Sequence, residues 1–265
     1  MRILVLGTSS SFGTTLADRA LAWPNVIGRE LAVHLGEPVH VEHRAIFPMG
    51  SKAVALAMDA VDETRPDMVI FSFGSFPCAI ATVGTRVKRR YGPRAYALFR
   101  RFETNFEGAT SNARGKPARF NTWGRRLARR IIGADPLTSY EEVAAVQTET
   151  LHRLASREGL SVVVYGEPSF GAGVTWDNPR ANRILHRLRG EIEAVARRHH
   201  FLVVSCEAAY AAHPRRATLH HSDGVHKTVE GHRVQAAEMM HALLANPEFL
   251  PSPAAAASPA APSHS

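Results

Sequence analysis

The chain has 265 residues, 45% of them hydrophobic, so it is long enough for one domain with a substantial core. Its net charge is +8, and its two cysteines are too few for a disulfide framework, which points to buried thiols in a reducing compartment. No stretch approaches the roughly 20 apolar residues of a membrane span, and we recognise no signal peptide, so we expect a cytoplasmic protein.

Strand-like and helix-like segments alternate along most of the chain. The apolar run at residues 3–6 precedes a serine-rich turn, and a helical pattern then extends over residues 14–35 with a kink or break near Trp23, because Pro24 follows. Further strands are expected at residues 38–44, 67–73, 160–165 and 201–205, and further helices at 52–64, 140–157, 181–199 and 229–245. This alternation predicts an α/β fold: one three-layer α/β/α domain around a mostly parallel sheet of about five strands.

Two segments depart from this rhythm. Residues 82–135 contain fourteen Arg or Lys residues and three acidic ones, a net charge of about +11, and are expected to form an insertion with short helices. Residues 251–265 consist of Pro, Ala and Ser with one His, a composition that cannot form a core, so we expect a disordered tail. The domain is therefore expected to span residues 1–246, including the basic insertion.

The first candidate site is the turn GTSSSFG at residues 7–13. Its glycines do not fit a Walker A loop, which also needs a lysine where Thr14 stands. A dinucleotide-binding turn needs G-x-G-x-x-G, whereas positions 9 and 10 are serines. Two interpretations remain, a serine that caps a helix and a catalytic serine displayed at a strand-to-helix turn.

A second candidate segment lies near the other end of the chain, at residues 222–232. Asp223 and His226 are three residues apart, a spacing that lets a carboxylate orient an imidazole acting as a general base. Together with His220 and His221 they also form a conceivable metal cluster, but no remote ligand set is visible, and we expect no metal.

The two segments together resemble motifs of the SGNH/GDSL hydrolase superfamily. The turn at residues 7–13 is similar to the first block of that family, which places the nucleophile at Ser9, with Ser10 and Ser11 as rivals in register. Asp223-Gly224-Val225-His226 resembles the closing block, which implies His226 as general base and Asp223 as its orienting acid. The resemblance covers roughly residues 2–245 and implies β/α units between the blocks.

The middle blocks of this family match less well. The resemblance implies an oxyanion hole made by the backbone N–H groups of Ser9 and Gly50. The family places an asparagine after its third strand, where this chain has Phe76, which cannot donate the corresponding hydrogen bond. Ser75 or Asn121 are the candidate substitutes.

The basic insertion contains an amphipathic helical pattern, in which Trp123, Leu127 and Ile131 recur at a spacing of four residues. This pattern is interpreted either as a helix packed over the domain or as a surface that binds an acidic protein or an anionic membrane. Nucleic acid is the less favoured partner for such a surface. The cations that would make this contact are Arg125, Arg126, Arg129 and Arg130. If the insertion acts as a lid, its residues Asn121 and Trp123 would contact the substrate. Ser75 and Phe76, which precede the insertion, would contribute further contacts.

We therefore expect a serine hydrolase that cleaves or transfers an acyl group from an ester or thioester through an acyl-Ser9 intermediate, without metal or organic cofactor. The substrate would be a small or carrier-borne acyl compound. The alternative is a non-catalytic protein of the same fold that uses its basic insertion to bind an anionic partner, which would be an acidic protein, a membrane surface or nucleic acid.

Overall fold

The computed structural model describes residues 1–47, 49–50, 52–111 and 130–250. Five parallel strands form the central sheet in the order β2-β1-β3-β6-β7, and β4 and β5 form a separate antiparallel pair. The strands are β1 Arg2–Gly7, β2 His40–Ala45, β3 Met68–Phe73, β4 Ala81–Thr82, β5 Asp135–Pro136, β6 Ser161–Gly166 and β7 Leu202–Ser205. The helices are α1 Trp23–Leu35, α2 Lys52–Thr64, α3 Phe76–Ala79, α4 Val83–Ser111, α6 Tyr140–Ala155, α7 Ala172–Asp177, α8 Ala181–Arg198, α9 Glu207–Ala212 and α10 Val229–Ala245. Short 3₁₀ turns occur at η1 Arg19–Leu21, η2 Arg216–Thr218 and η3 Pro247–Phe249.

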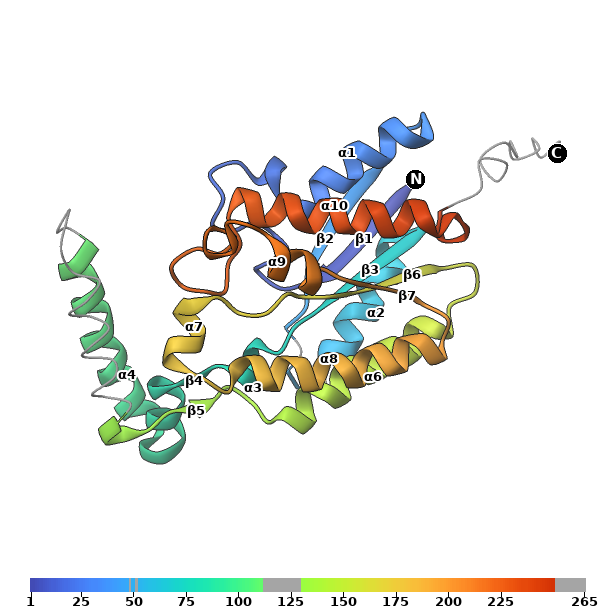
Figure 1. The fold of residues 1–265 in the computed structure, drawn as a ribbon. Helices are drawn as coiled ribbons and strands as arrows, with labels where there is room; N and C mark the ends of the chain where they lie inside the picture. Colours follow the sequence, from blue (N-terminus) through green and yellow to red (C-terminus); the bar gives the residue numbers. More distant parts are fainter. Residues whose placement is uncertain (48, 51, 112–129, 251–265) are drawn as a thin grey trace, which may run out of the picture.

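Helices cover both faces of the sheet. Figure 1 shows α1 and α10 on one face and α2, α6 and α8 on the other. Successive side chains of a strand point to opposite faces, so Ile3 and Val5 of β1 pack in the core on the α1/α10 side, whereas Leu4 and Leu6 pack on the α2/α6/α8 side. The predicted α/β fold class is confirmed, and both faces are buried, as a parallel sheet requires.

The predicted helix over residues 14–35 is wrong in its first part. Residues 9–15 form turns, η1 follows, and α1 begins only at Trp23. The reason is Pro24, which fits the first turn of a helix but would clash with the preceding turn in a helix interior. The chain is therefore free to form a loop directly after β1.

In the described part of the basic insertion, α4 consists of two helical segments, and residues 130–132 are helical as well. Gly92 interrupts α4 with φ 84° and ψ 177°, and Pro93 follows, so two helical segments meet at this kink. Figure 1 shows α4 extending away from the sheet and its flanking helices. The predicted amphipathic segment around Trp123 and the predicted tail at residues 251–265 lie outside the described residues.

Cys78 and Cys206 are both free and buried, as predicted. In the part of the chain that the structure describes, no helix is long and apolar enough to cross a membrane.

Candidate active site

Ser9 lies in the turn that follows β1 at the carboxyl edge of the sheet. The Ser11 N–H donates to the Thr8 carbonyl at 3.0 Å and closes the turn, which leaves the Ser9 side chain exposed. Glycine at position 7 leaves room for the turn, because a Cβ there would lie 2.7 Å from the Ser11 hydroxyl. Strand and turn together present one serine at the edge where ligands bind in open α/β sheets.

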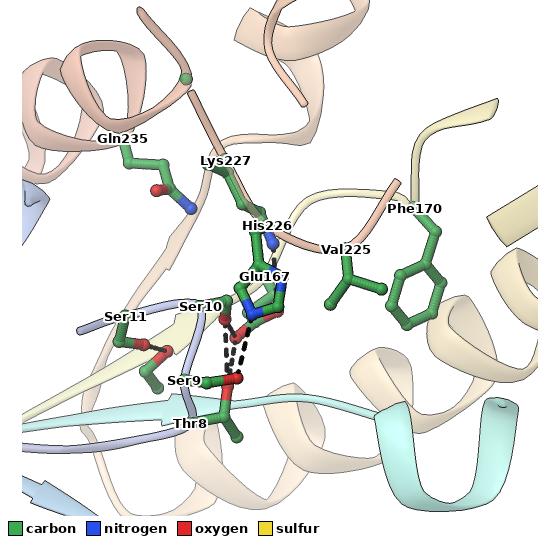
Figure 2. A network of polar contacts seen from close by, with 12 residues as sticks. Thr8, Ser9, Ser10, Ser11, Glu167, Phe170, Val225, His226, Lys227 and Gln235 are labelled. Atoms are coloured by element: carbon green, nitrogen blue, oxygen red, sulfur yellow. Dashed lines mark hydrogen bonds and ion pairs between the residues drawn. The ribbon is translucent and has the colours of Figure 1, made fainter. Parts of the chain in front are cut away.

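Asp223 and His226 meet Ser9 from the segment that precedes α10. The His226 Nε2 atom is 3.3 Å from the Ser9 hydroxyl, and its Nδ1 atom is 2.7 Å from Asp223 Oδ2. Figure 2 shows the His226 ring above Ser9. The structure thus brings together the side chains of Ser9, Asp223 and His226, although Ser9 and His226 are 217 positions apart in the sequence.

The local sequence explains how this segment is shaped. Asp223 Oδ1 accepts the backbone N–H groups of Val225 and His226, at 2.8 and 3.0 Å, which closes a tight turn and leaves Oδ2 for the imidazole. Gly224 has φ 71°, and a Cβ there would lie 2.6 Å from the Val174 nitrogen, so no other residue fits.

The electrostatics favour an ionised Asp223. Partial burial acts to raise the pKa of the Asp223 carboxyl, but the hydrogen bonds from His226 and from the two backbone N–H groups outweigh it and lower that pKa. A carboxylate at Nδ1 holds the Nδ1–H tautomer of His226 and leaves Nε2 free to accept a proton from Ser9.

A buried ion pair lies directly behind Ser9. Glu167 follows β6, and its carboxylate accepts hydrogen bonds from the Thr8 hydroxyl at 3.0 Å and from the Ser10 hydroxyl. The Lys227 ammonium lies 3.2 Å from its other oxygen (Figure 2). Sequence reasoning missed both charged residues. Their only signals were positional: Glu167 directly follows a predicted strand, and Lys227 directly follows His226.

The rival serines have other partners. The Ser10 hydroxyl is held by Glu167, and the Ser11 hydroxyl donates to Ser72 at 2.9 Å; both side chains are buried. Among the described residues, neither has an imidazole as a hydrogen-bond partner, so the geometry favours Ser9 over both.

The predicted oxyanion donor Gly50 is already occupied. Its N–H donates to Glu142 Oε1 at 2.7 Å, and the same carboxylate accepts the Thr138 hydroxyl. These bonds, from Thr138 first and Gly50 second, lower the pKa of Glu142. Gly50 therefore faces a carboxylate rather than an open site in this conformation.

The other predicted contacts are divided. Phe76 is the first residue of α3, and its ring packs edge-on against Phe47 with centroids 6.3 Å apart. Ser75 is fully buried, and its hydroxyl has no hydrogen-bond partner among the described residues. Asn121 and Trp123 lie outside the described residues, as do Arg125, Arg126 and Arg129.

The two other histidines of the conceivable metal cluster have separate surroundings. His220 packs edge-on against Tyr210 with centroids 5.6 Å apart, and the His221 N–H donates to the His226 carbonyl. Within the described ranges, no group of three or more His, Cys, Asp or Glu side chains is arranged to hold a metal ion.

Known proteins resemble this chain in structure and not in sequence. No protein-family model and no curated protein matches the sequence. Among solved structures, TesA is 15% identical with a TM-score of 0.55, covering 94% of this chain and 100% of its own. A lipase/acylhydrolase from Enterococcus faecalis is 14% identical with a TM-score of 0.54, covering 91% of this chain and 94% of its own. Axe2, an acetylxylan esterase from Geobacillus stearothermophilus, is 12% identical with a TM-score of 0.54, covering 91% and 93%.

These structures share one architecture over nearly the whole chain. The protein therefore has the fold of the SGNH/GDSL hydrolases, which its first and last motifs predicted. At identities of 12–15% the likeness is one of fold.

Proposed function

We propose that this protein is a serine hydrolase of the SGNH/GDSL type that cleaves or transfers an acyl group from an ester or thioester. The observation that carries this proposal is the chain of contacts from Ser9 through His226 to Asp223, at 3.3 and 2.7 Å. The Ser9–His226 distance is at the long end for a hydrogen bond.

The reaction follows from these contacts. The Ser9 oxygen attacks the acyl carbonyl while His226 Nε2 takes its proton, and Asp223 stabilises the imidazolium that forms. His226 then protonates the departing alcohol or thiol as the acyl–leaving-group bond breaks. Water, or an acceptor alcohol or amine, attacks the acyl-Ser9 ester in the same way and regenerates the serine. None of these steps calls on a metal or organic cofactor.

Stabilisation of the oxyanion is the weak part of the site. We propose the backbone N–H groups of Ser9 and Gly50 as donors, which requires that Gly50 be released from Glu142. A single donor is typically worth 10²–10³ in rate, so a site that lacks the asparagine side chain at Phe76 is expected to be slow.

The substrate class is proposed from charge. In the described part of α4, Lys88, Arg90 and Arg94 are exposed, and the sequence adds Arg125, Arg126, Arg129 and Arg130. This surplus of positive charge favours an anionic acyl donor, such as a carrier-borne thioester, or an acidic protein or membrane surface as partner.

The test is labelling with a fluorophosphonate, which forms a stable bond only with an activated serine, followed by mass spectrometry of the modified peptide. One adduct on Ser9 is expected in the wild type, with none in Ser9→Ala and a strongly reduced rate in His226→Ala. An adduct on Ser10 or Ser11, or no adduct on the folded protein, would refute the assignment.

A second function is favoured by the occupied Gly50 and by Phe76: a non-catalytic protein that binds an anionic partner through its basic insertion. If replacement of the four arginines at positions 125, 126, 129 and 130 by alanine abolishes partner binding while wild-type Ser9 remains unreactive, this second function replaces the first.

A further inference from the structure

The Glu167 carboxylate lies between the two segments that carry Ser9 and His226. Its Oε1 atom accepts the hydroxyls of Thr8 and Ser10, the residues immediately before and after Ser9. Its Oε2 atom accepts the ammonium of Lys227, the residue immediately after His226. One side chain thus contacts both neighbours of the nucleophile and a neighbour of the base (Figure 2).

Direct hydrogen bonds between these two segments are few among the described residues. Among the described residues, the Ser9–His226 contact is the only direct hydrogen bond between the turn at residues 8–11 and the segment at residues 220–228. Glu167 supplies a second, indirect connection, from Thr8 and Ser10 to Lys227.

The pair is buried, and the buried Arg189 guanidinium lies beside it and donates to the Glu167 carbonyl oxygen. Lys227 is 1% exposed and Glu167 is 6% exposed. His220 and His232, which face Lys227 from the preceding loop and from α10, are neutral because burial, and then the nearby ammonium, lowers their pKa values to about 3 and about 4. Burial raises the pKa values of Tyr165, Tyr210 and Cys206 around the pair, so these groups are neutral too.

The neighbours of Glu167 favour its ionised form. Burial acts to raise the pKa of Glu167, but Lys227 and the hydroxyls of Ser10 and Thr8 outweigh it and lower that pKa. Buried ion pairs contribute little net stability compared with apolar residues of the same size, so stability alone is a poor reason for one at this place. Fixed hydrogen-bond geometry is what an ion pair supplies and an apolar pair does not.

We propose that Glu167 and Lys227 are positioning residues that hold the Ser9 hydroxyl in line with the His226 imidazole. This inference rests on the proposed serine hydrolase function. Neither residue touches the acyl group; both act through the backbone of the turn and of the His226 segment. Displacement of reacting atoms by about 1 Å costs on the order of 10²-fold in rate, which sets the scale of the effect.

The test uses a matched pair of serines in one turn. Ser10→Ala removes a hydroxyl that contacts Glu167, whereas Ser11→Ala removes a hydroxyl of another buried serine, which contacts Ser72. We measure the second-order rate constant of fluorophosphonate labelling and, separately, the fraction of protein labelled at completion. Ser10→Ala is expected to slow labelling about tenfold with full labelling at completion, and Ser11→Ala to stay within about twofold of wild type.

Two further sets of variants address the pair and its other hydroxyl. The charge-free double variant Glu167→Leu/Lys227→Met is expected to fold with a lowered melting temperature, because the Ser10 and Thr8 hydroxyls lose their acceptor, and to label about 100-fold more slowly, again to completion. Thr8→Val is expected to slow labelling, whereas Thr8→Ser, which keeps the hydroxyl, retains the wild-type rate. With p-nitrophenyl acetate, the slowed variants should lose kcat while KM stays unchanged. If the double variant does not fold, the Thr8 and Ser10 variants decide.

Each result has a distinct meaning. If Ser10→Ala and Thr8→Val label at the wild-type rate, the inference is wrong while the hydrolase function stands. If they label a smaller fraction of molecules at an unchanged rate, the pair serves folding only, and the inference is again wrong. If folded wild-type protein does not label at all, the proposed function fails and takes this inference with it.

Discussion

Replacement of Asp223 by asparagine tests the proposed chemistry with the least disturbance of structure. The carbonyl oxygen of asparagine can still accept the N–H groups of Val225 and His226, so the turn is retained. Its NH₂ group then faces His226 Nδ1, where Asp223 Oδ2 lies at 2.7 Å in the wild type. Because NH₂ is a donor, Nδ1 must become the acceptor, and the imidazole proton moves to Nε2, which faces Ser9 at 3.3 Å.

An imidazole that carries its proton on Nε2 cannot accept the proton of Ser9. We therefore expect Asp223→Asn to lower kcat about 10⁴-fold, or roughly 5.5 kcal/mol in activation free energy. The assay is p-nitrophenyl ester hydrolysis at pH 8, checked by the rate of fluorophosphonate labelling. The melting temperature should hardly change, since the Asp223 side chain is 44% exposed and its turn is kept.

Asp18→Asn is the matched control, because Asp18 also accepts a backbone N–H within a turn, from Ala20 at 2.9 Å, but has no imidazole partner among the described residues. It should leave kcat unchanged. A loss of less than tenfold in Asp223→Asn would show that the orientation of His226 does not depend on this carboxylate, and the assigned triad would be wrong.

Three further predictions concern stability, the oxyanion site and the basic insertion. Burial, and then Lys227, lowers the pKa values of His220 and His232 to about 3 and about 4 from 6.5, so below pH 6.5 the unfolded chain binds protons that the folded protein does not. The free energy of unfolding should therefore fall by about 4 kcal/mol between pH 7 and pH 5, measured by urea denaturation, and a flat profile would contradict their neutral burial. Glu142→Ala frees the Gly50 N–H and removes a negative charge that opposes an oxyanion by on the order of 1 kcal/mol. This variant should therefore raise the labelling rate up to about tenfold. An unchanged rate would show that Gly50 is not part of the oxyanion hole. Hydrolysis of a coenzyme A or carrier thioester should fall steeply with added salt while hydrolysis of a neutral ester does not, and equal responses would exclude a role for α4 and the arginines beyond it in substrate binding.

Much of the fold was readable because it depends on local patterns. The helices at residues 52–64 and 229–245 were predicted to the residue, since α2 has a clear apolar periodicity and α10 begins after the Thr228 cap. The break near Trp23 was predicted from Pro24, and α1 begins there, but the segment before it was wrongly assigned to a helix because its apolar residues continue the helical period.

The candidate site was readable where its parts are close in sequence. Asp223 and His226 are linked by a three-residue turn, and a serine turn after the first strand is placed at the carboxyl edge by topology alone. Gly50 was assigned from a resemblance, but its hydrogen-bond partner Glu142 is 92 residues away, so its occupied N–H had no signal in the sequence.

The sequence by itself determined the α/β alternation, the turn that presents Ser9 and the carboxylate–imidazole spacing near the other end, because each is set by neighbours along the chain. Only the tertiary structure decided that Glu167 and Lys227 are buried against each other behind that turn. In sequence, each is indistinguishable from the charged residues that usually remain in water. Their burial is tolerable only because the fold brings opposite charges and two hydroxyl donors together in one enclosed space, which no single segment of the chain could specify.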